Sequence, residues 1–588
     1  MILQALKEYY DRKAADPQSG IAPPGWCVKG ISFIIVLDEK GNFISIKDMR
    51  DGEGKKKVAK EYVVPQAVKK TSGIAANLLW DTAGYVLGID LKKPKKQEEQ
   101  KRAFIDKIKE LGEIDDLKPV ITFLETDNSG VLQADPNYQE LVEENAVVSF
   151  CYYNDAELIC RRSNVIKAIN KTVGEKSGAA ICLVSGELDE TARVHPSIKG
   201  LGKEAQTSGA NIVSFNLPAF GSYNKKQGYN APIGESATFA YTTALNLLLR
   251  KELKQKISIG GDTLVFWSAK ETSIESDFAS WFEEPPKDDP DARTHKIKAL
   301  LKSVETGAYT EPDGKELFYI LGLSPNAARI SIRLWRCETV GNFAFHIAQY
   351  FNDMAIIKPP NEPEHYSLWR VLVNIAIQNE SKNIPPNIAG EMMVSIIDGT
   401  PFPVSVLMAA LRRIKSDKDY GVKPVRAALI KAYLNRLCKK DNARYLNPNN
   451  KELGMSLDVT MPVVGYQLGR LFAALEKIQQ EGLGDTNTTI RERYYSTAST
   501  SPTTVFPILM RMKQHHIAKI EKKGRQINFE KLLTEIMSRI DVSKSEAFPG
   551  HLDINAQGYF AIGYYHQMQD FYTKHDTKTA PETEAVTE

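Results

Sequence analysis

A proline-rich segment, Lys358-Pro-Pro-Asn-Glu-Pro363, separates two parts of the chain that differ in hydrophobic periodicity. Three prolines within five positions exclude a continuous helix and a central strand, because proline lacks the N–H donor and fixes its φ angle. We therefore expect a linker here, between a part that mixes strands and helices and a part that is helical.

The part before this linker alternates between short apolar runs and helical patterns. We expect an amphipathic helix around residues 2–12 and two strands at residues 31–37 and 43–46. The turn between these strands, residues 38–41, ends in a glycine that can adopt a positive φ angle. Further expected elements are strands at residues 179–185, 263–267 and 330–335 and helices at residues 97–111 and 342–354.

Beyond the linker, apolar residues recur with the helical period, which predicts a helical bundle. The predicted fold class is α+β: a mixed N-terminal region followed by this bundle. We expect an N-terminal α+β lobe (1–125), a central α+β lobe (126–358) and the bundle (359–588). Its expected helices span residues 368–377, 405–414, 425–437, 466–480, 505–522 and 529–540.

The charge of the chain is unevenly distributed along the sequence. The whole chain carries +3, but residues 405–540 hold 24 lysines and arginines against 12 acidic residues, which leaves −9 for the rest. Such asymmetry favours an acidic partner for the C-terminal part, and nucleic acid is the first candidate. A solvated helical surface remains the alternative.

The cysteines and the N-terminus indicate the compartment. The six cysteines form no CxxC pair, so we expect neither a cysteine-based zinc site nor a need for disulfides. The first residues lack the apolar stretch of a signal peptide, and no apolar run is long enough to span a membrane. We expect a cytoplasmic protein.

Catalytic motifs are missing from the sequence. We find no GxxxxGK[ST] phosphate loop and no Gly-x-Ser-x-Gly nucleophile elbow. An acidic cluster of Glu187, Asp189 and Glu190, with His195 nearby, could bind a metal ion, although a solvated turn is the alternative. We expect no catalytic residues, no cofactor and no metal.

The most unusual segment, residues 213–232, is rich in Asn, Gln, Ser, Tyr, Lys and Gly, and is called the polar loop below. Lysines neutralise phosphates, amide side chains reach base edges, and glycine lets a backbone approach closely. The segment therefore predicts a contact with duplex DNA; an ordinary loop remains the alternative. Its candidate residues are Asn216, Ser222, Tyr223, Asn224, Lys225, Lys226, Gln227 and Asn230.

Two further segments carry candidate DNA contacts. Residues 69–81 place two lysines beside small hydroxyl residues, whereas Trp80 in that segment fits a core position. The second segment, in the C-terminal part, carries cations near one helix end, where they could bind a single strand. The candidates are Lys69, Lys70, Thr71, Ser72 and Asn77 in the first segment, and Lys513, Lys519, Lys522, Lys523 and Arg525 in the second.

Several blocks in the sequence resemble one protein family, the large subunits of type I-C CRISPR surveillance complexes (Cascade). The blocks occur in family order and cover essentially the whole chain. One departure is Gly221, where the family pattern Phe-Glu-Ser-Tyr has glutamate. The blocks are Asn77-Leu-Leu-Trp-Asp81, Tyr85-Val-Leu-Gly-Ile-Asp90, Cys182-Leu-Val-Ser-Gly-Glu187, His195-Pro-Ser-Ile-Lys-Gly200, Ser214-Phe-Asn, Ala219-Phe-Gly-Ser-Tyr223, Asn230-Ala-Pro232, Leu321-Gly-Leu-Ser-Pro-Asn326, Gly469-Arg-Leu-Phe-Ala-Ala-Leu-Glu-Lys-Ile-Gln479 and Gly563-Tyr-Tyr-His-Gln567.

The resemblance implies a non-catalytic protein that recognises the protospacer-adjacent motif in duplex DNA, promotes unwinding into an R-loop and holds the displaced strand. Base pairing with the RNA then reads the target, while protein reads only the short motif. The implied partners are backbone subunits that hold CRISPR RNA, an RNA-processing subunit, a small helical subunit, the target DNA and a helicase–nuclease that the complex recruits. No membrane partner is implied. The alternatives are a metal-dependent nuclease using Glu187, Asp189, Glu190 and His195, or a structural scaffold that binds RNA or protein.

The resemblance also implies that the small subunit is translated from within the same gene. Two internal starts are available, Met455 and Met461. Lys451-Glu452 can be encoded by a purine-rich sequence that binds ribosomes, and Leu453-Gly454 supply a two-codon spacer before Met455. No comparable run precedes Met461 at that distance. We therefore favour Met455, which gives a product of about 134 residues (588 − 455 + 1).

Overall fold

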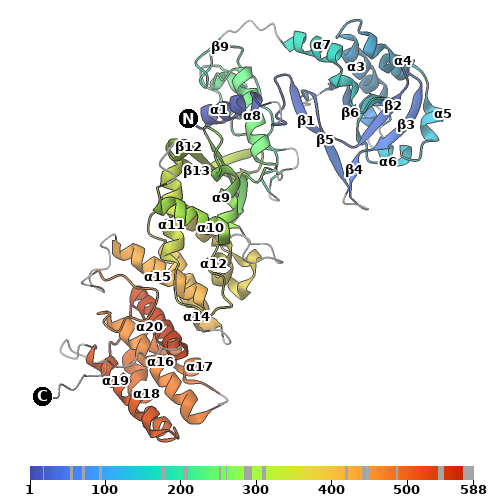
Figure 1. Cartoon of the computed structure of the whole chain (residues 1–588). Helices are drawn as coiled ribbons and strands as arrows, with labels where there is room; N and C mark the ends of the chain where they lie inside the picture. Colours follow the sequence, from blue (N-terminus) through green and yellow to red (C-terminus); the bar gives the residue numbers. More distant parts are fainter. Residues whose placement is uncertain are drawn as a thin grey trace, which may run out of the picture. The chain divides into compact units, whose positions relative to one another are not determined.

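The computed structural model groups the Cα positions of the chain into two compact units (Figure 1). Unit 1 comprises Met1–Leu253 with Pro325–Ser331, and unit 2 comprises Lys254–Ser324 with Ile332–Glu588. The predicted α+β class is confirmed. The structure describes residues 1–16, 19–52, 57–68, 73–89, 91, 96–173, 180–202, 205–206, 209–250, 253–259, 261–283, 294–307, 313–417, 421–439, 447, 450–484, 488–540 and 548–573.

Unit 1 contains a four-stranded sheet in the order β3-β2-β7-β6. Its central strand β2 (Phe33–Leu37) is apolar and fully buried, as expected for a strand covered on both faces. It pairs antiparallel with β3 (Phe43–Asp48) and parallel with β7 (Val147–Tyr152), which pairs with β6 (Trp80–Thr82). Since β7 lies beyond residue 125, this sheet includes residues from both sides of the expected lobe boundary.

The predicted turn between β2 and β3 is confirmed. The Asp38 carboxylate accepts the backbone N–H groups of Lys40 and Asn42, and Gly41 has φ +90°. Hydrogen bonds from Asn42 and neighbouring N–H groups hold the pKa of Asp38 below its usual value.

A second sheet of unit 1 has the order β1-β5-β4. Its strands pair antiparallel, and β1 supplies Trp26 to the same hydrophobic core as β2. Helices α3 and α4 lie beside the four-stranded sheet (Figure 1). The elements are β1 (Trp26–Ile31), β4 (Arg50–Asp51), β5 (Val58–Pro65), α2 (Ala83–Val86), α3 (Gln97–Lys109), α4 (Lys118–Glu125), α5 (Ser129–Gln133), α6 (Tyr138–Glu143) and α7 (Ser163–Val173).

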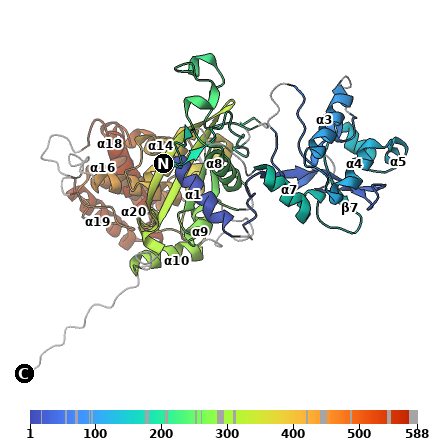
Figure 2. The same ribbon diagram turned by 90° about the horizontal axis from the view of Figure 1, so that it is seen from above.

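The rest of unit 1 supports the polar loop. Helix α1 (Ile2–Ala14), close to the predicted helix, lies alongside α8 (Glu235–Leu248) in both ribbon views (Figure 1, Figure 2). The expected buried strand at residues 179–185 is wrong. Only β8 (Ala180–Ile181) is extended, paired with β9 (Leu188–Asp189), because the chain turns back at Cys182, whose carbonyl accepts the Gly186 N–H.

Unit 2 begins with a sheet in the order β10-β11-β12-β13. The predicted strands at 263–267 and 330–335 and the predicted helix at 342–354 are confirmed as β11, β13 and α11. The tip of the β12–β13 hairpin, Pro325–Ser331, groups with unit 1. The elements are β10 (Lys256–Ile259), β11 (Asp262–Ser268), β12 (Leu317–Asn326), β13 (Arg329–Thr339), α9 (Ile274–Phe282), α10 (Thr294–Glu305) and α11 (Val340–Asp353).

Helices α12 to α20 complete unit 2, and the six predicted helices are present. Helices α12 and α19 end two residues before the expected positions, and α18 stops at Ala518, so the helix expected to reach residue 522 is wrong at its end. The elements are α12 (Leu368–Ile375), α13 (Pro386–Ile397), α14 (Val404–Ser416), α15 (Pro424–Lys439), α16 (Val464–Leu483), α17 (Ile490–Ala498), α18 (Pro502–Ala518), α19 (Lys523–Ser538) and α20 (Ile554–Tyr572).

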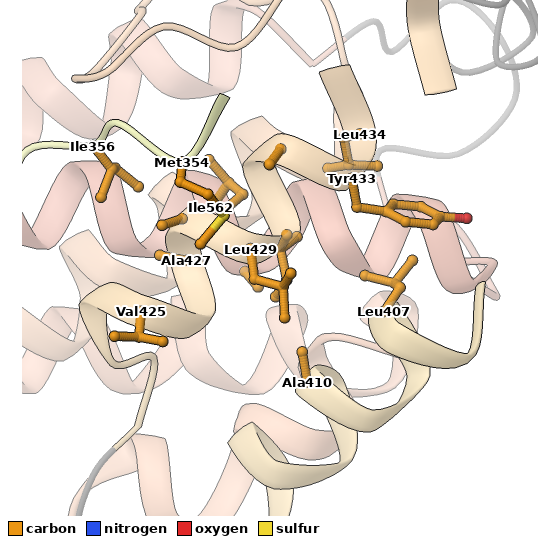
Figure 3. Packing of buried hydrophobic residues seen from close by; sticks show 14 of the residues in the cluster. Met354, Ile356, Leu407, Ala410, Val425, Ala427, Leu429, Tyr433, Leu434 and Ile562 are labelled. Carbon is orange, nitrogen blue, oxygen red and sulfur yellow. The ribbon is translucent and has the colours of Figure 1, made fainter. Parts of the chain in front are cut away.

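The proline-rich segment joins elements of one hydrophobic core. Met354 and Ile356, which precede it, belong to the same buried cluster as Leu429 of α15 and Ile562 of α20 (Figure 3). Apolar residues of the sheet, such as Phe266, belong to it as well. The helical bundle therefore shares its core with the sheet that precedes it. No helix in the described ranges is long and apolar enough to cross a membrane.

Candidate nucleic-acid interface

The polar loop is tied at its C-terminal end to the segment around β8 and β9. Leu183 donates its backbone N–H to the carbonyl of Pro232 (2.9 Å), and Gly234 forms an isolated antiparallel β-bridge with Thr191. The Gly234 N–H also points at the sulfur of Cys182, 3.2 Å away. Burial raises the pKa of the Cys182 thiol, but hydrogen bonds to its sulfur outweigh this and hold the pKa below its usual value. The loop therefore has a fixed base.

A tight turn forms the exposed tip of the loop. The Lys225 N–H donates to the carbonyl of Ser222 (2.9 Å), and the two central residues, Tyr223 and Asn224, have φ +49° and +56°. Two consecutive positive φ angles define a type I′ turn. Asparagine tolerates this conformation, whereas tyrosine adopts it rarely, so the Tyr223 backbone is strained.

Asn230 holds this turn in place. Its side-chain oxygen accepts the Ser222 N–H (2.8 Å), and its amide nitrogen donates to the carbonyls of Lys225 and Gln227 (both 3.0 Å). One side chain thus satisfies three backbone groups, as a segment without regular structure requires. Asn230 therefore shapes the loop from within.

Gly228 allows the loop to lie directly on the preceding chain. Its N–H donates to the carbonyl of Arg193, and a Cβ atom there would come within 2.0 Å of the Ala192 carbonyl oxygen. Any side chain would push the loop away from this support, so glycine is required by close approach.

The loop presents cations and an aromatic ring to solvent. The Tyr223 side chain is 95% exposed, and Lys225 and Lys226 are also exposed. No aspartate or glutamate occurs between Ala205 and Gly234, so no acid within the loop offsets these charges. A surface with this chemistry suits the phosphates and stacked bases of nucleic acid. Of the other candidates, Ser222, Asn224 and Asn216 are exposed, whereas Gln227 and Asn230 are half-buried.

Two arginines that the sequence analysis missed also contact the loop. Arg193 donates from Nη1 to Oε1 of Gln227 (2.6 Å), and Arg329 donates from Nη2 to Oδ1 of Asn216 (2.6 Å). The Arg329 guanidinium also lies 4.1 Å from the ring centroid of Phe220. The sequence gives no signal for Arg329, because it lies 113 residues from Asn216.

The second candidate segment lies only partly within the described residues. Lys69, Lys70, Thr71 and Ser72 lie outside the described residues. Asn77 is 5% exposed, and its side-chain oxygen accepts the N–H of Val68 while its own N–H donates to Asp81. Asn77 therefore fixes the segment internally and presents no exposed amide. Trp80 is buried, as expected, and donates its indole N–H to the carbonyl of Pro65.

The C-terminal cations divide into two kinds. Lys513 is 7% exposed and pairs with Glu530 (2.9 Å), and Arg525 forms a two-bond ion pair with Glu481 (2.7 and 2.8 Å). The Arg525 guanidinium also holds the pKa of the Glu481 carboxyl below its usual value. Lys513 and Arg525 therefore form ion pairs within the protein, and their predicted contact with the displaced strand stays a prediction.

The remaining three cations form an exposed basic corner between α18 and α19, made of Lys519, Lys522 and Lys523. Lys522 is the N-cap of α19 and Lys523 its first residue, and the first turn contains no acid. Cations at the positive end of a helix dipole are unfavourable. The exposed Glu521 also lies at this corner, immediately before Lys522, so the three lysines leave a net positive charge at a local cost to the helix.

The residues of the metal-site alternative have structural contacts. Asp189 accepts the Ser236 N–H (2.9 Å) in the first turn of α8, and His195 is buried with Nδ1 2.5 Å from the Tyr241 hydroxyl. Burial raises the pKa of Tyr241. Across the described ranges, no three His, Cys, Asp or Glu side chains gather into a group that could hold a metal ion.

Comparison with known proteins identifies the family. The family model described as "CRISPR-associated protein (Cas_Csd1)" matches residues 6–572. No curated protein matches the chain significantly. Because the family model matches nearly the whole chain, the chain belongs to the Cas_Csd1 family of CRISPR-associated proteins.

Proposed function

We propose that this chain is the non-catalytic large subunit of a type I-C CRISPR RNA-guided surveillance complex, acting in the cytoplasm. In this role it reads the protospacer-adjacent motif in duplex DNA and promotes opening of the duplex next to it. The RNA reads the remaining target by base pairing, so the protein needs to recognise only a short duplex element. The membership of the Cas_Csd1 family supports a role in CRISPR defence.

The observation that carries the proposal is the architecture of the polar loop. Its tip is a strained turn, fixed by Asn230 and seated on Gly228, that exposes Tyr223 beside Lys225 and Lys226. A rigid, cationic, acid-free projection suits a duplex groove, because lysines bind phosphates and an aromatic ring can stack on or wedge between bases.

The basic corner supports the second part of the role, which is binding of the displaced strand. Lys519, Lys522 and Lys523 are exposed, the first turn of α19 contains no acid, and the exposed Glu521 offsets only one of the three charges. Single-stranded DNA is held by such positive surfaces, with a strong dependence on salt. The proposed partners are the RNA-bound backbone subunits, an RNA-processing subunit, a small helical subunit and a recruited helicase–nuclease. No cofactor is proposed.

A binding selection tests the proposal. The complex assembled around the full chain is offered target duplexes whose flanking bases are randomised, and the bound duplexes are sequenced. We expect enrichment of one short motif beside the target and loss of that enrichment when Tyr223, Lys225 and Lys226 are all replaced by alanine. Binding without any flanking preference would favour a structural scaffold, and magnesium-dependent cleavage by the purified chain would favour a nuclease.

A further inference from the structure

Three of the four amide side chains of the polar loop point toward the protein through their oxygen atoms, whereas Asn224 is exposed. Oδ1 of Asn216 accepts from Arg329, Oε1 of Gln227 accepts from Arg193, and Oδ1 of Asn230 accepts a backbone N–H of the loop itself. An amide reads adenine through its oxygen and nitrogen together. With the oxygens occupied, these three residues are placed to orient other groups.

Arg329 is held rigidly at the edge of the loop. It begins β13 at the tip of the β12–β13 hairpin, where Asn211 donates its N–H to the carbonyl of Ala328 and accepts the N–H of Ile330. Its guanidinium plane is fixed by Asn216 on one edge and by the Phe220 ring at 4.1 Å. A guanidinium has five N–H donors, and this arrangement uses one of them.

Arg193 occupies an equivalent position at the other end of the loop. Its backbone carbonyl accepts the Gly228 N–H, and its exposed side chain reaches Gln227 at 2.6 Å. Neither Arg193 nor Arg329 forms an ion pair with an acidic side chain in the part of the chain that the structure describes. Both guanidinium groups therefore keep their full charge and most of their donors for a ligand.

We infer that Arg193 and Arg329 bind backbone phosphates of the duplex that the polar loop contacts, and that Gln227 and Asn216 are their positioning residues. The inference rests on the proposed function, because the duplex is the ligand proposed there. The plane of Arg329 is fixed by the Phe220 ring and by Asn216, so it presents parallel N–H donors that match two phosphate oxygens, while Arg193 is oriented by Gln227. Phosphate contacts set the register of the loop on the duplex, while Tyr223 and its neighbours remain available for the bases.

Binding of labelled target duplex by the assembled complex, measured between about 50 and 200 mM salt, tests the inference. We expect Arg329→Gln and Arg193→Gln each to weaken binding about tenfold and to lower the salt slope by about one, without changing the preferred motif. Arg329→Lys keeps the charge and therefore the slope, but loses the fixed plane and binds less tightly than the parent. Arg162→Gln is the matched control: this arginine also stacks on a ring, 4.6 Å from that of Tyr152, but pairs with Asp116 and Asp155.

A double-mutant cycle tests the positioning role. If Asn216 acts only through Arg329, then Asn216→Ala weakens binding in the parent but has no further effect in the Arg329→Gln background. Additive losses would show that Asn216 contacts DNA itself and would overturn its assignment. If both glutamine variants bind with the affinity and salt slope of the parent, or if they prefer a different motif, the assignment of the phosphate contacts is overturned. A parent complex that binds no duplex would overturn the proposed function and this inference with it, whereas the other failures leave the proposed function standing.

Discussion

Asn230 is the side chain on which the shape of the polar loop depends most. Its three hydrogen bonds close the segment between Ser222 and Gln227, and its neighbours in the turn are exposed. Because the segment packs little apolar surface, these bonds are the main restraint on its conformation. An unrestrained loop must lose conformational freedom when it binds, which lowers affinity.

We therefore expect Asn230→Ala to weaken binding of the target duplex about tenfold, roughly 1.4 kcal/mol, with little change in thermal stability. Measurement of duplex affinity and of the melting temperature in parallel checks this. Asn164→Ala is a suitable control, since Asn164 is an exposed asparagine with one side-chain bond, to Asp116. A large fall in melting temperature for Asn230→Ala, or an unchanged affinity, would contradict the role given to Asn230.

The buried His566 in α20 makes the stability of unit 2 depend on pH. Its side chain is 1% exposed, and its Nδ1 lies 3.0 Å from the Tyr466 hydroxyl. Burial and the charge of Lys431 lower the pKa of His566 to about 4, while the charge of Asp458 acts in the opposite direction. In the unfolded chain the pKa returns to about 6.5, so the unfolded state binds the proton first as pH falls. Above about pH 6.5, the free energy of unfolding therefore does not change with pH through His566. It falls as the pH drops from about 6.5 toward 4, because the unfolded chain binds the proton that the buried histidine does not.

At about pH 5 the loss amounts to about 2 kcal/mol. The melting temperature of the parent should accordingly fall more steeply between about pH 7.5 and pH 5 than that of His566→Asn, which retains a polar group near Tyr466. The exposed His515 supplies the control His515→Asn, which should follow the parent. Parallel curves for the parent and His566→Asn would contradict the assignment.

At the residue scale, the sequence predicts where the polar loop is but not which atoms it presents. Its position follows from local composition. The orientation of its amides depends on Arg193 and Arg329, which lie 34 and 113 residues from their partners. Likewise, Lys513 and Arg525 look like free cations in the sequence, and only the fold brings Glu530 and Glu481 to them.

The charges at the N-terminus of helix α19 destabilise that helix. Lys522 and Lys523 sit where the helix dipole favours acidic groups. Their replacement by glutamate should therefore raise the stability of the helix by about 0.3–1 kcal/mol per site. The same replacement should weaken binding of the displaced strand, because it reverses the charge of the basic corner.

Because the two substitutions should stabilise the helix but weaken strand binding, they separate an effect on function from an effect on folding. We expect Lys522→Glu/Lys523→Glu to melt at or above the temperature of the parent, to bind intact duplex normally and to open it poorly. Permanganate footprinting of the displaced strand measures the opening. Lys531→Glu, an exposed lysine further along α19, controls for the change in net charge. Unchanged opening, or an equal loss of duplex binding and opening, would contradict a strand-binding role for the corner.

Among the elements, periodicity finds six helices beyond the proline-rich segment and misses others, including α20. Every residue of α20 from Ala556 to Gln567 is buried, so no polar stripe marks one face of the helix there. The opposite error occurred at residues 179–185, where an apolar run suggested a buried strand. There Ile181 and Leu183 are 65% and 57% exposed, so the run belongs to a surface turn.

At the scale of the whole molecule, the structure bears on the internal start expected in the C-terminal part. Residues just before α16 complete its first turns: the Asp458 N–H donates to the Tyr466 hydroxyl, and the Val459 carbonyl accepts from Gln467 at 3.4 Å. Met461 is 1% exposed, whereas Met455 is 57% exposed. A start at Met461 would remove these contacts and bury a charged terminal amine, which is costly. A start at Met455 keeps the contacts and leaves the amine in solvent.

We therefore expect a second product of about 134 residues (588 − 455 + 1) that begins at Met455. Mass spectrometry of the complex expressed from the single gene measures it. Synonymous changes at codons 451 and 452 should reduce the small product and leave the large chain unchanged. A small product that begins at Met461, or one that persists after the codon changes, would contradict the assignment.

The central claim, that the polar loop meets the duplex beside the target, is tested most directly by crosslinking from its tip. Tyr223→p-benzoyl-phenylalanine places a photoreactive ring at the residue that is 95% exposed in the turn. The same substitution at Tyr153, which is 63% exposed and lies outside the loop, is the control. After irradiation of the complex on target duplex, we predict crosslinks from position 223 to the base pairs that flank the target and none from position 153. Crosslinks from position 223 only to RNA or protein, or none at all, would contradict the claim.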